Sequence, residues 1–382
     1  MADATTAAGF SSPRIALAHD WLTGMRGGEK ILEVLAELYP SAHLFTLVHW
    51  RGSVSPTIER LRIRTSIVQR LPFGARRYRH FLPLFPFAVE QWDLDAYDAV
   101  VSTSHCAVKS VVRTGRSRHL CYCMTPMRYA WDQFPSYFGA ERVGRLPSAA
   151  LRPVLAALAR WDRATSSRVD RYVAISQYVA ARIGRYYNRR AEIVYPPVDT
   201  AFYHPDGRQR EDFALVVSAL VPYKRVDLAI AACRAASIPL RIVGDGPDRA
   251  KLEQSGSTGA TFLGTLTDNE IRELYRAARM TILPGVEDFG IVPVEAQACG
   301  CPVVALRQGG VVETVRHGET GVLVDEPTAE SLACGIERAR TSRFDPDAAR
   351  VQALRFSRER FRSEIRRTID DMLNAPTDRL RW

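Results

Sequence analysis

The stretch RMTILPGVEDFGIVPVEAQACGCPVVAL, residues 279–306, contains a strand, a loop, a helix and a second strand. Residues 279–285 and 302–306 are apolar runs of strand length, and residues 292–300 between them have a helical composition. A crossover helix between two buried strands is the connection that parallel strands require. The stretch therefore predicts a parallel sheet with helices packed on it.

The same alternation continues through the rest of the chain in two series. The run YPPVDTAFYHPD (195–206) separates them, because three prolines and no helical period are typical of a linker. The predicted strands are 14–19, 43–48, 98–104, 119–124 and 171–176, and then 212–220, 240–246, 261–264, 279–285, 302–306 and 321–325. We therefore predict two doubly wound α/β domains that face a central cleft, about 14–195 and 200–355, with a basic helix at about 357–382.

The charge of the chain is uneven. The 382 residues carry 52 Lys and Arg against 42 Asp and Glu, for a net charge of +10. Residues 1–200 contain 27 basic and 16 acidic residues, whereas residues 201–382 contain 25 and 26. This asymmetry indicates that the two halves meet different partners.

Composition also excludes several classes of protein. Hydrophobic residues make up 46% of the chain, which excludes a disordered or fibrous protein, and no apolar run is long enough to span a membrane. The seven cysteines have no common zinc spacing, and the N-terminus lacks the plan of a signal peptide. These features predict a protein of the reducing cytoplasm.

Two glutamates of the opening stretch are candidate ligand-binding residues. Glu287 follows the predicted strand, and Glu295 lies eight positions later inside the helix. The unpaired N–H groups where that helix begins, near 289–291, favour an anion or a sugar hydroxyl. The alternative is that Glu287 caps the helix and Glu295 is a solvated surface residue.

Other candidates lie where predicted strands turn into helices. Lys224 occupies such a turn in SALVPYKRVD (218–227), where a lysine would pair with a diphosphate. The two glycines of IVGDGP (242–247) let the backbone approach a ligand, or serve only to make a tight turn. Gly309 and Gly310 precede a further helix.

With these residues the chain resembles the retaining, nucleotide-sugar-dependent glycosyltransferases of the GT-B fold, family 4, over about residues 14–340. The motifs that carry the resemblance are PYKR at 222–225, the pair Glu287 and Glu295 within EDFGIVPVEAQACG, and the GG-x-x-E loop that ends at Glu313. The first half adds HDWLTGMRGGEK (19–30), FPFAVEQWDL (85–94), CYCMTPMRYAWD (121–132) and YPPVD (195–199). These segments resemble the branch that builds bacterial surface polysaccharides, many of whose members are mannosyltransferases.

The resemblance implies a role for each matched residue. Lys224 would bind the donor diphosphate and Glu295 the ribose hydroxyls, while Glu287 would hold the transferred sugar. The backbone of Phe289, Gly290 and Ile291 would assist Glu287, Gly27 and Gly28 would approach the diphosphate and sugar, and Leu266 and Asp268 would seat the nucleobase.

The chain departs from the family pattern at two positions. Relatives often carry arginine where this chain has Ala219, and histidine where it has Met124. Because Ala219 leaves the donor diphosphate without one expected cation, we expect Arg225 or Arg26 to supply that positive charge. A thioether cannot donate a hydrogen bond, so either His105 or His19 replaces the histidine or the sugar is recognised differently.

The expected chemistry needs no metal or other cofactor. Lys224 and the helix N-terminus at 289–291 would stabilise the negative charge that develops on the departing diphosphate. The triplet Asp93-Leu94-Asp95 has the spacing of a metal site but follows an apolar aromatic stretch. The resemblance implies retention of configuration, and Asp20 is only a weak candidate nucleophile, so we expect front-face attack with the donor phosphate taking the acceptor's proton.

The basic excess is concentrated in residues 60–92, which hold seven arginines, six aromatic residues and Glu90 as the single acid. No nucleic-acid recognition module fits this segment, so we predict no nucleic-acid partner. Contact with an anionic membrane fits better, with Arg70, Arg76, Arg77 and Arg79 as the candidate residues. The alternative is that the aromatic residues are core and the arginines are merely solvated.

Together with these features, the resemblance implies a cytoplasmic retaining glycosyltransferase that is peripheral at the inner face of the cell membrane. Its first domain would bind a lipid-linked or saccharide acceptor, its second domain the nucleotide sugar, and its last helix would cross back to the first domain. GDP-mannose is the favoured donor and a UDP-hexose the runner-up. The alternatives are a sugar-nucleotide epimerase of GT-B-like fold and a non-catalytic scaffold of an assembly complex.

Overall fold

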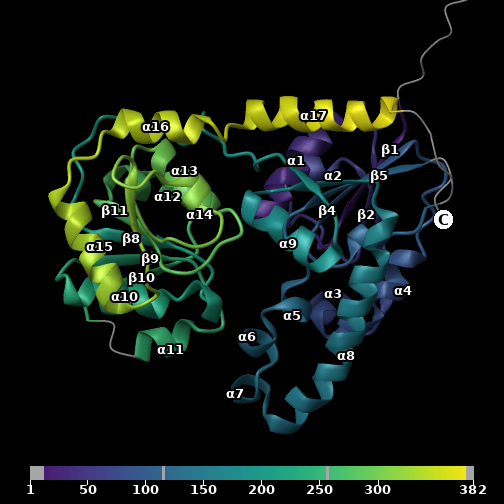
Figure 1. Ribbon diagram of the computed structural model, residues 1–382, viewed down its shortest axis with the longest axis horizontal. Helices are drawn as coiled ribbons and strands as arrows, with labels where there is room; N and C mark the ends of the chain where they lie inside the picture. Colours follow the sequence, from purple (N-terminus) through teal and green to yellow (C-terminus); the bar gives the residue numbers. More distant parts are fainter. Residues whose placement is uncertain (1–12, 114–116, 255–257, 376–382) are drawn as a thin grey trace, which may run out of the picture. The chain divides into compact units, whose positions relative to one another are not determined.

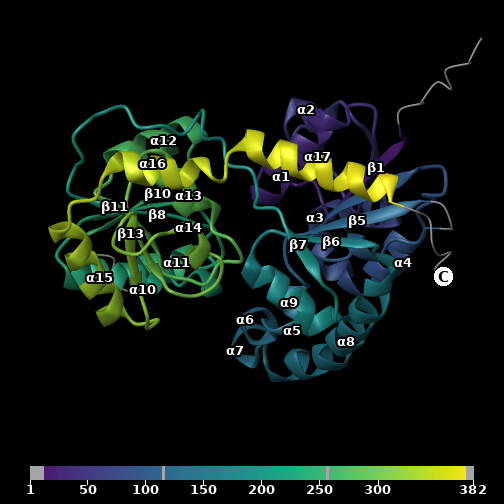
Figure 2. The same cartoon turned by 45° about the horizontal axis from the view of Figure 1, so that its top comes forward.

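The computed structural model describes residues 13–113, 117–254 and 258–375, which form two compact units. Among the described residues, the first unit contains 13–122, 164–172 and 368–375, and the second contains 123–163 and 173–367. Figures 1 and 2 show the helices and strands from two directions. None of the helices in the described part of the chain is long and apolar enough to cross a membrane.

The first sheet has seven strands in the order β3-β2-β1-β4-β5-β6-β7. Its strands are β1 Ile15–His19, β2 His43–Thr46, β3 Arg62–Thr65, β4 Ala99–Ser104, β5 Arg118–Cys123, β6 Arg171–Ala174 and β7 Ala191–Ile193. The helices of this part of the chain are α1 Gly27–Leu38, α2 Pro56–Glu59, α3 Gly74–Arg77, α4 Phe85–Glu90, α5 Arg128–Trp131, α6 Phe134–Phe138, α7 Ala140–Val143, α8 Arg145–Ala164 and α9 Gln177–Tyr187. Strands β1, β2, β3 and β4 pair in parallel, as the alternation of apolar runs predicted.

The second sheet has six strands in the order β10-β9-β8-β11-β12-β13. Its strands are β8 Ala214–Val217, β9 Leu240–Val243, β10 Ala260–Gly264, β11 Met280–Leu283, β12 Val303–Leu306 and β13 Gly321–Val324. The helices that follow them are α10 Val226–Ala235, α11 Arg249–Gln254, α12 Asp268–Ala277, α13 Ile291–Ala298, α14 Val311–Thr314, α15 Ala329–Thr341, α16 Pro346–Leu354 and α17 Arg358–Asn374. Every pair in this sheet is parallel.

Helices cover both faces of the second sheet. In Figures 1 and 2, α10, α11 and α15 lie on one face, and α12, α13 and α16 lie on the other. Apolar residues of α10 and α15 pack on the strands to form a continuous core, with Ile230 and Ile336 among them. A sheet covered on both faces explains why its strands are continuous apolar runs.

The strand order of each sheet reverses beside its first strand. In the second sheet the chain runs from β8 outward to β10 and then returns to β11 on the other side of β8. Ligands of such folds bind at this switch point, beyond the carboxyl ends of the strands. The switch points lie between β1 and β4 in the first sheet and between β8 and β11 in the second.

A buried histidine in the first sheet makes stability depend on pH. The side chain of His119 on β5 is fully buried and forms a 2.7 Å hydrogen bond with Ser102 of β4. Burial, with a smaller contribution from Arg113, lowers the pKa of His119 to about 3. The unfolded chain therefore binds more protons than the folded chain between pH 3 and 6.5, and stability is lost as the pH falls through this window.

We expect the free energy of unfolding to fall by about 2 kcal/mol between pH 7 and pH 5 because of His119 alone. The variant His119→Gln, which cannot titrate, should lose that part of the pH dependence. Urea unfolding of both proteins at the two pH values measures the difference. Equal pH dependence in the two proteins would contradict the assignment to His119.

Candidate functional site

The loops that follow β8 and β11 at the switch point of the second sheet bring together Lys224 and Glu287. Lys224 ends a short 3₁₀ turn, Pro222–Lys224, and Glu287 lies between β11 and α13. The Lys224 ammonium donates a hydrogen bond to Oε1 of Glu287. The two side chains are 18% and 13% exposed, so each still reaches solvent. The structure thus brings together the two residues to which the sequence assigned diphosphate and sugar binding.

Glycines allow these loops to approach each other. A Cβ atom on Gly285 would lie 2.5 Å from the backbone oxygen of Tyr223, so only glycine lets the β11 loop pass beside the lysine turn. Gly309 has a φ of +78°, and a Cβ there would lie 2.2 Å from the carbonyl oxygen of Glu287. That carbonyl accepts the N–H of Gly310 at 2.8 Å. The GG-x-x-E loop therefore supports the backbone of Glu287 directly.

The glycines of IVGDGP also serve close packing of the backbone. A Cβ on Gly244 would lie 2.0 Å from the carbonyl oxygen of Ser218, and one on Gly246 would lie 2.4 Å from that of Leu220. Both glycines therefore let this turn pack closely against the loop after β8. This turn holds the start of the loop that carries Lys224.

The charge state of Lys224 follows from its neighbours. Burial alone would lower the pKa of Lys224, but the attraction of Glu287 outweighs it, and the pKa is raised above its ordinary value. Lys224 therefore remains an ammonium, as a diphosphate site requires. Its partner Glu287 offers a carboxylate that can accept hydrogen bonds from hydroxyl groups.

A second cation, Arg128, lies beside this pair and was missed in the sequence. The guanidinium of Arg128 and the ammonium of Lys224 each lie 5.2 Å from the ring centre of Tyr223. Burial would lower the pKa of Arg128, but Asp288 and, to a smaller extent, Tyr223 and Glu287 raise it above its ordinary value. Arg128 is therefore a permanent cation near Lys224, and its guanidinium is held by Asp288.

Asp288 anchors Arg128 and a second arginine. Its Oδ2 atom accepts hydrogen bonds from Nε and Nη2 of Arg128, the former at 3.0 Å, and its Oδ1 atom accepts one from Nη1 of Arg182 at 2.9 Å. The Asp288 carbonyl accepts a 2.5 Å hydrogen bond from Oγ of Ser176. The buried carboxylate therefore fixes the backbone next to Glu287, and is itself fully occupied.

The sequence signal for this network was weak. The sequence predicted no role for Asp288, and Arg128 and Arg182 lie more than a hundred positions before it. A buried acid inside an apolar loop needs a cationic partner, and that requirement was the available clue. The sequence gives no way to choose the partners among so many arginines.

The helix α13 begins directly after this loop. Gly290 precedes it with a φ of +88°, and Phe289 is buried between Tyr195 and Phe356. Ile291 is the first residue of the helix. The backbone at 289–291 is thus held by aromatic packing and by a turn that favours glycine.

Glu295 lies one turn into α13 and is largely buried. Its Oε2 atom accepts a 3.2 Å hydrogen bond from the hydroxyl of Tyr275, on α12. Burial, and next the charge of Glu295, raise the pKa of Tyr275 well above its ordinary value, so the hydroxyl stays a donor. The alternative of a solvated surface residue does not describe Glu295.

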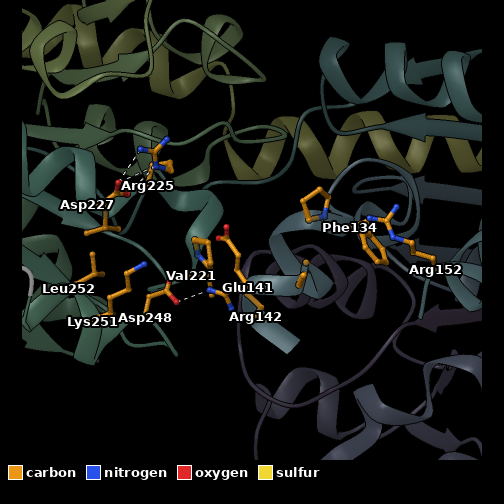
Figure 3. Close-up of a pocket in the computed structure, with 15 residues that line it drawn as sticks. Phe134, Glu141, Arg142, Arg152, Val221, Arg225, Asp227, Asp248, Lys251 and Leu252 are labelled. Atoms are coloured by element: carbon orange, nitrogen blue, oxygen red, sulfur yellow. Dashed lines mark hydrogen bonds and ion pairs between the residues drawn. The ribbon is translucent and has the colours of Figure 1, made fainter. Parts of the chain in front are cut away.

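The remaining candidates in this unit have different settings. Leu266 is half-buried, and Asp268 is the exposed first residue of α12. Arg225 forks onto Asp227 through three contacts of 3.0–3.3 Å (Figure 3), and both side chains are exposed. Glu313 accepts the N–H groups of residues 177 and 178 and thereby caps α9.

In the first unit, the candidates His19, Asp20 and His105 gather at the switch point of the first sheet. Both carboxylate oxygens of Asp20 are buried and accept the N–H groups of residues 105–108 at 2.7–3.0 Å. The Nδ1 atom of His105 lies 3.2 Å from Asp20, and the His105 side chain is partly exposed. Asp20 thus holds the loop after β4, with no lone pair directed toward solvent for a nucleophilic role.

Gly27 and Gly28 open α1, directly after the exposed Arg26. The Nδ1 atom of His19 forms a 2.6 Å hydrogen bond with Thr103. Glu29, next to the two glycines, accepts the Arg26 N–H at 3.1 Å. Burial opposes ionisation of Glu29, but His19 is the main partner that brings its pKa below the ordinary value, so Glu29 is a carboxylate.

The basic segment of the first unit exposes both charge and aromatic surface. Arg70, Arg76, Arg77 and Arg79 are exposed, as are Phe73 at 72% and Phe87 at 55%. Three other aromatic residues of the segment are buried: Tyr78, Phe85 and Trp92. Part of the aromatic set therefore belongs to the core, and part is exposed as membrane contact would require. The triplet at 93–95 forms a turn in which Asp93 accepts the N–H of Asp95.

Comparisons with known proteins match part of the second unit to a known family. Residues 203–353, which include Lys224, Glu287 and Glu295, match the family described as Glycosyl transferases group 1. A D-inositol 3-phosphate glycosyltransferase from Rhodococcus opacus is 32% identical over 200 residues, covering 44% of this chain and 45% of the relative. The chain spans about half the length of the curated relatives that it matches. The matched region covers between 40% and 52% of the length of each relative compared.

Solved structures extend the likeness to nearly the whole chain. The Anabaena protein Alr3699/HepE in complex with UDP and glucose aligns with a TM-score of 0.70 at 19% identity, covering 94% of this chain and 99% of that chain. The apo form of WaaB, a lipopolysaccharide outer core galactosyltransferase, aligns with a TM-score of 0.65 at 15% identity, covering 94% and 99%. The predicted GT-B fold of two parallel-sheet α/β domains is therefore confirmed.

Proposed function

We propose that this chain is a glycosyltransferase that moves a hexose from a nucleotide sugar to a saccharide acceptor. The Lys224–Glu287 pair at the switch point carries the proposal, because it offers a fixed cation for a diphosphate and a carboxylate for sugar hydroxyls. The match of residues 203–353 to group 1 glycosyltransferases supports the same assignment.

In the proposed mechanism, Lys224 binds the donor diphosphate and Arg128 supplies the second positive charge. The bond between the anomeric carbon and the diphosphate breaks, and these cations together with the backbone at 289–291 stabilise the departing negative charge. The acceptor hydroxyl forms the new bond from the same face, and its proton passes to a donor phosphate oxygen. Configuration is therefore retained, and the occupied carboxylate of Asp20 supports this route over a covalent intermediate.

Other donor contacts follow the sequence motifs. Glu295 would hold the ribose hydroxyls, Leu266 and Asp268 the nucleobase, and Gly27 and Gly28 the diphosphate and sugar. Mannose from GDP-mannose is the donor that the sequence resemblance favours, whereas the UDP complexes of the Anabaena protein favour a UDP-hexose. Neither a metal ion nor another cofactor enters the proposal.

A panel of GDP-, UDP-, ADP- and TDP-sugars tests the function and the donor together. The matching nucleotide sugar should raise the melting temperature of the full chain by mass action and be consumed when a saccharide acceptor is added. Transfer with retained configuration supports the proposal. Consumption of donor without transfer to any acceptor would favour the epimerase, and no thermal shift with any donor would favour the scaffold.

Replacing Glu295 should weaken donor binding more than catalysis. Glu295→Gln keeps the shape of the side chain but removes the charge that accepts ribose hydroxyls, so we expect the donor KM to rise about tenfold with kcat little changed. Tyr275→Phe is the matched control, since it removes the hydrogen bond to Glu295 but keeps the carboxylate. A fall in kcat with an unchanged KM would contradict this role.

We further propose that the basic segment of the first unit holds the protein at the inner face of an anionic membrane, where a lipid-linked saccharide would be met. The exposed Phe73 and Phe87 can enter the headgroup layer, and each nearby arginine adds about 1 kcal/mol of attraction. The lipopolysaccharide enzyme WaaB among the structural neighbours supports an acceptor of this kind.

Charge reversal tests the membrane proposal. Arg76→Glu with Arg77→Glu should lower binding to phosphatidylglycerol vesicles at low salt by at least about tenfold, because two attractive charges become repulsive. The control Arg338→Glu alters an exposed arginine of α15 in the second unit. Vesicle sedimentation measures both. Equal binding by the two variants would remove the basic segment from the proposal.

A further inference from the structure

Glu313, the last residue of the GG-x-x-E loop, takes no part in the proposed mechanism. It lies in the short helix α14 and is half-buried. The carbonyl oxygen of Thr314, the last residue of α14, accepts hydrogen bonds from Nε2 of Gln297 at 3.0 Å and from Nε2 of Gln352 at 3.1 Å. Both glutamines are buried, so the backbone that carries Glu313 is held from two other helices.

The carboxylate of Glu313 binds the beginning of α9. Its Oε2 atom accepts the N–H of Gln177 at 2.9 Å, and its Oε1 atom accepts the N–H of Tyr178 at 3.2 Å. The hydroxyl of Ser176, the N-cap residue, accepts the N–H of Val179 at 3.0 Å. The first three N–H groups of α9 are therefore satisfied, and a carboxylate faces the positive end of the helix dipole.

The same helix holds the backbone that follows Glu287. The Ser176 hydroxyl donates to the carbonyl oxygen of Asp288 at 2.5 Å, and Arg182, further along α9, donates to Oδ1 of Asp288 at 2.9 Å. The position of α9 therefore sets the position of Asp288 through both its backbone and its side chain. Because Glu313 fixes the beginning of α9, it acts on Asp288 through this helix.

Glu313 reaches the same loop by a second path, through Tyr195. Burial, and next the charge of Glu313 and a hydrogen bond to it, raise the pKa of Tyr195, so the phenol hydroxyl remains a donor. The ring of Tyr195 packs against that of Phe289, with the ring centres 5.9 Å apart. Glu313 thus also contacts a residue that fixes the backbone at 289–291.

A third path runs along the loop that carries Glu313. The Glu313 N–H donates to the carbonyl oxygen of Gly310 at 3.0 Å, and the Gly310 N–H donates to the carbonyl oxygen of Glu287 at 2.8 Å. Each of the three residues 287–289 is therefore held by an element that Glu313 binds or belongs to. Attachments at three successive residues restrict the backbone on which the Glu287 carboxylate depends for its orientation.

We propose that Glu313 is a positioning residue that holds Glu287 in the orientation in which it binds the transferred sugar, without itself contacting the donor. This inference rests on the proposed glycosyltransferase function and adds a residue to it. The expected effect is selective. Loss of the Glu313 carboxylate should impair recognition and transfer of the sugar but leave binding of the nucleotide alone intact, because Lys224 and Glu295 are both retained.

Glu313→Gln tests the proposal with a side chain of the same shape. An amide has one oxygen and one NH₂ group, so it can accept only one of the two α9 N–H groups and turns a donor toward the other. With the nucleotide sugar that the panel selects, we expect kcat to fall about tenfold or more and the dissociation constant to rise about threefold to tenfold. The dissociation constant of the matching nucleoside diphosphate should stay within about twofold of wild type. Steady-state kinetics and calorimetry measure these values.

Tyr195→Phe is a milder variant that tests the second path. It removes the hydroxyl that donates to Glu313 but keeps the ring that packs on Phe289. We expect kcat to fall about threefold, with nucleoside diphosphate binding unchanged. In the double variant with Glu313→Gln the two losses should not add, because both break the same hydrogen bond. Full additivity would overturn the path through Tyr195.

Thr328→Ala is the matched control for the loss of a helix cap. Thr328 is the N-cap residue of α15, a helix that packs on α10, β12 and β13, and its hydroxyl accepts the N–H of Ser331 at 3.2 Å. We expect this control to lower the melting temperature, as loss of a cap does, and to leave kcat and both dissociation constants unchanged.

The outcomes separate the inference from the function on which it rests. Equal kinetics of Glu313→Gln and Thr328→Ala would reduce Glu313 to a helix cap and overturn the inference. Weakening of the nucleoside diphosphate as much as the nucleotide sugar in Glu313→Gln would also overturn it, because a general disturbance of the site would then explain the loss. Absence of nucleotide binding in wild type would instead overturn the proposed function.

Discussion

Lys224→Met should abolish transfer, with kcat reduced by about 10³-fold or more, because it removes a preorganised cation from the departing diphosphate. The change also removes the hydrogen-bond donor of Glu287, whose side chain is only 13% exposed. The first effect acts on the departing diphosphate, and the second acts on the carboxylate proposed to hold the sugar. Glu287→Gln should give a comparable loss, since an amide cannot replace the charged acceptor of the sugar hydroxyls.

Steady-state kinetics with the donor identified by the panel measures both variants. Arg338→Ala, an exposed position on α15, is the control for general effects of losing a cation. Circular dichroism should show the same fold in all of them. A fully active Lys224→Met enzyme would remove the proposed mechanism.

Arg128→Gln is the second change with a large expected effect. It removes one of the two arginines that contact Asp288. The partly unpaired Asp288 carboxylate should lower the free energy of unfolding by about 2–3 kcal/mol, which is less than for a buried carboxylate with no partner. The substitution also removes the cation beside Lys224, so donor affinity should fall about tenfold to a hundredfold.

The double variant Arg128→Gln with Asp288→Asn separates the two consequences. Replacing the carboxylate by an amide removes the uncompensated charge, so stability should recover by about 1–2 kcal/mol. Donor affinity should not recover, because the second cation is still missing. Recovery of both in the double variant would show that Arg128 acts on the fold alone, and not on the donor.

How far the sequence predicts the fold depends on the kind of strand. The buried strands, such as β11 and β12, were predicted because both faces are covered and their sequences are continuously apolar. The edge strands β3 and β7 were missed. β3 has the sequence RIRT with two exposed arginines, so its pattern did not stand out from the basic segment around it.

The sequence predicted those candidate residues that lie near one another in the chain or at a recognisable turn. Glu287, Glu295 and the start of α13 share one stretch, and the turn after a parallel strand accounts for Lys224. The partners of Asp288 come from α5 and α9, and a sequence with 52 basic residues does not indicate which of them will meet one carboxylate. The hydrogen bonds that occupy Asp20 likewise depend on the loop after β4, far along the chain.

The most direct test of the central claim is a calorimetric titration of wild-type protein and Lys224→Met with the nucleotide sugar that the panel selects. The proposed function predicts binding to wild type that is weakened about a hundredfold or more in the variant, because the diphosphate loses its main cation. Equal affinity of the two proteins would show that the switch point between β8 and β11 does not hold the donor, and would contradict the account.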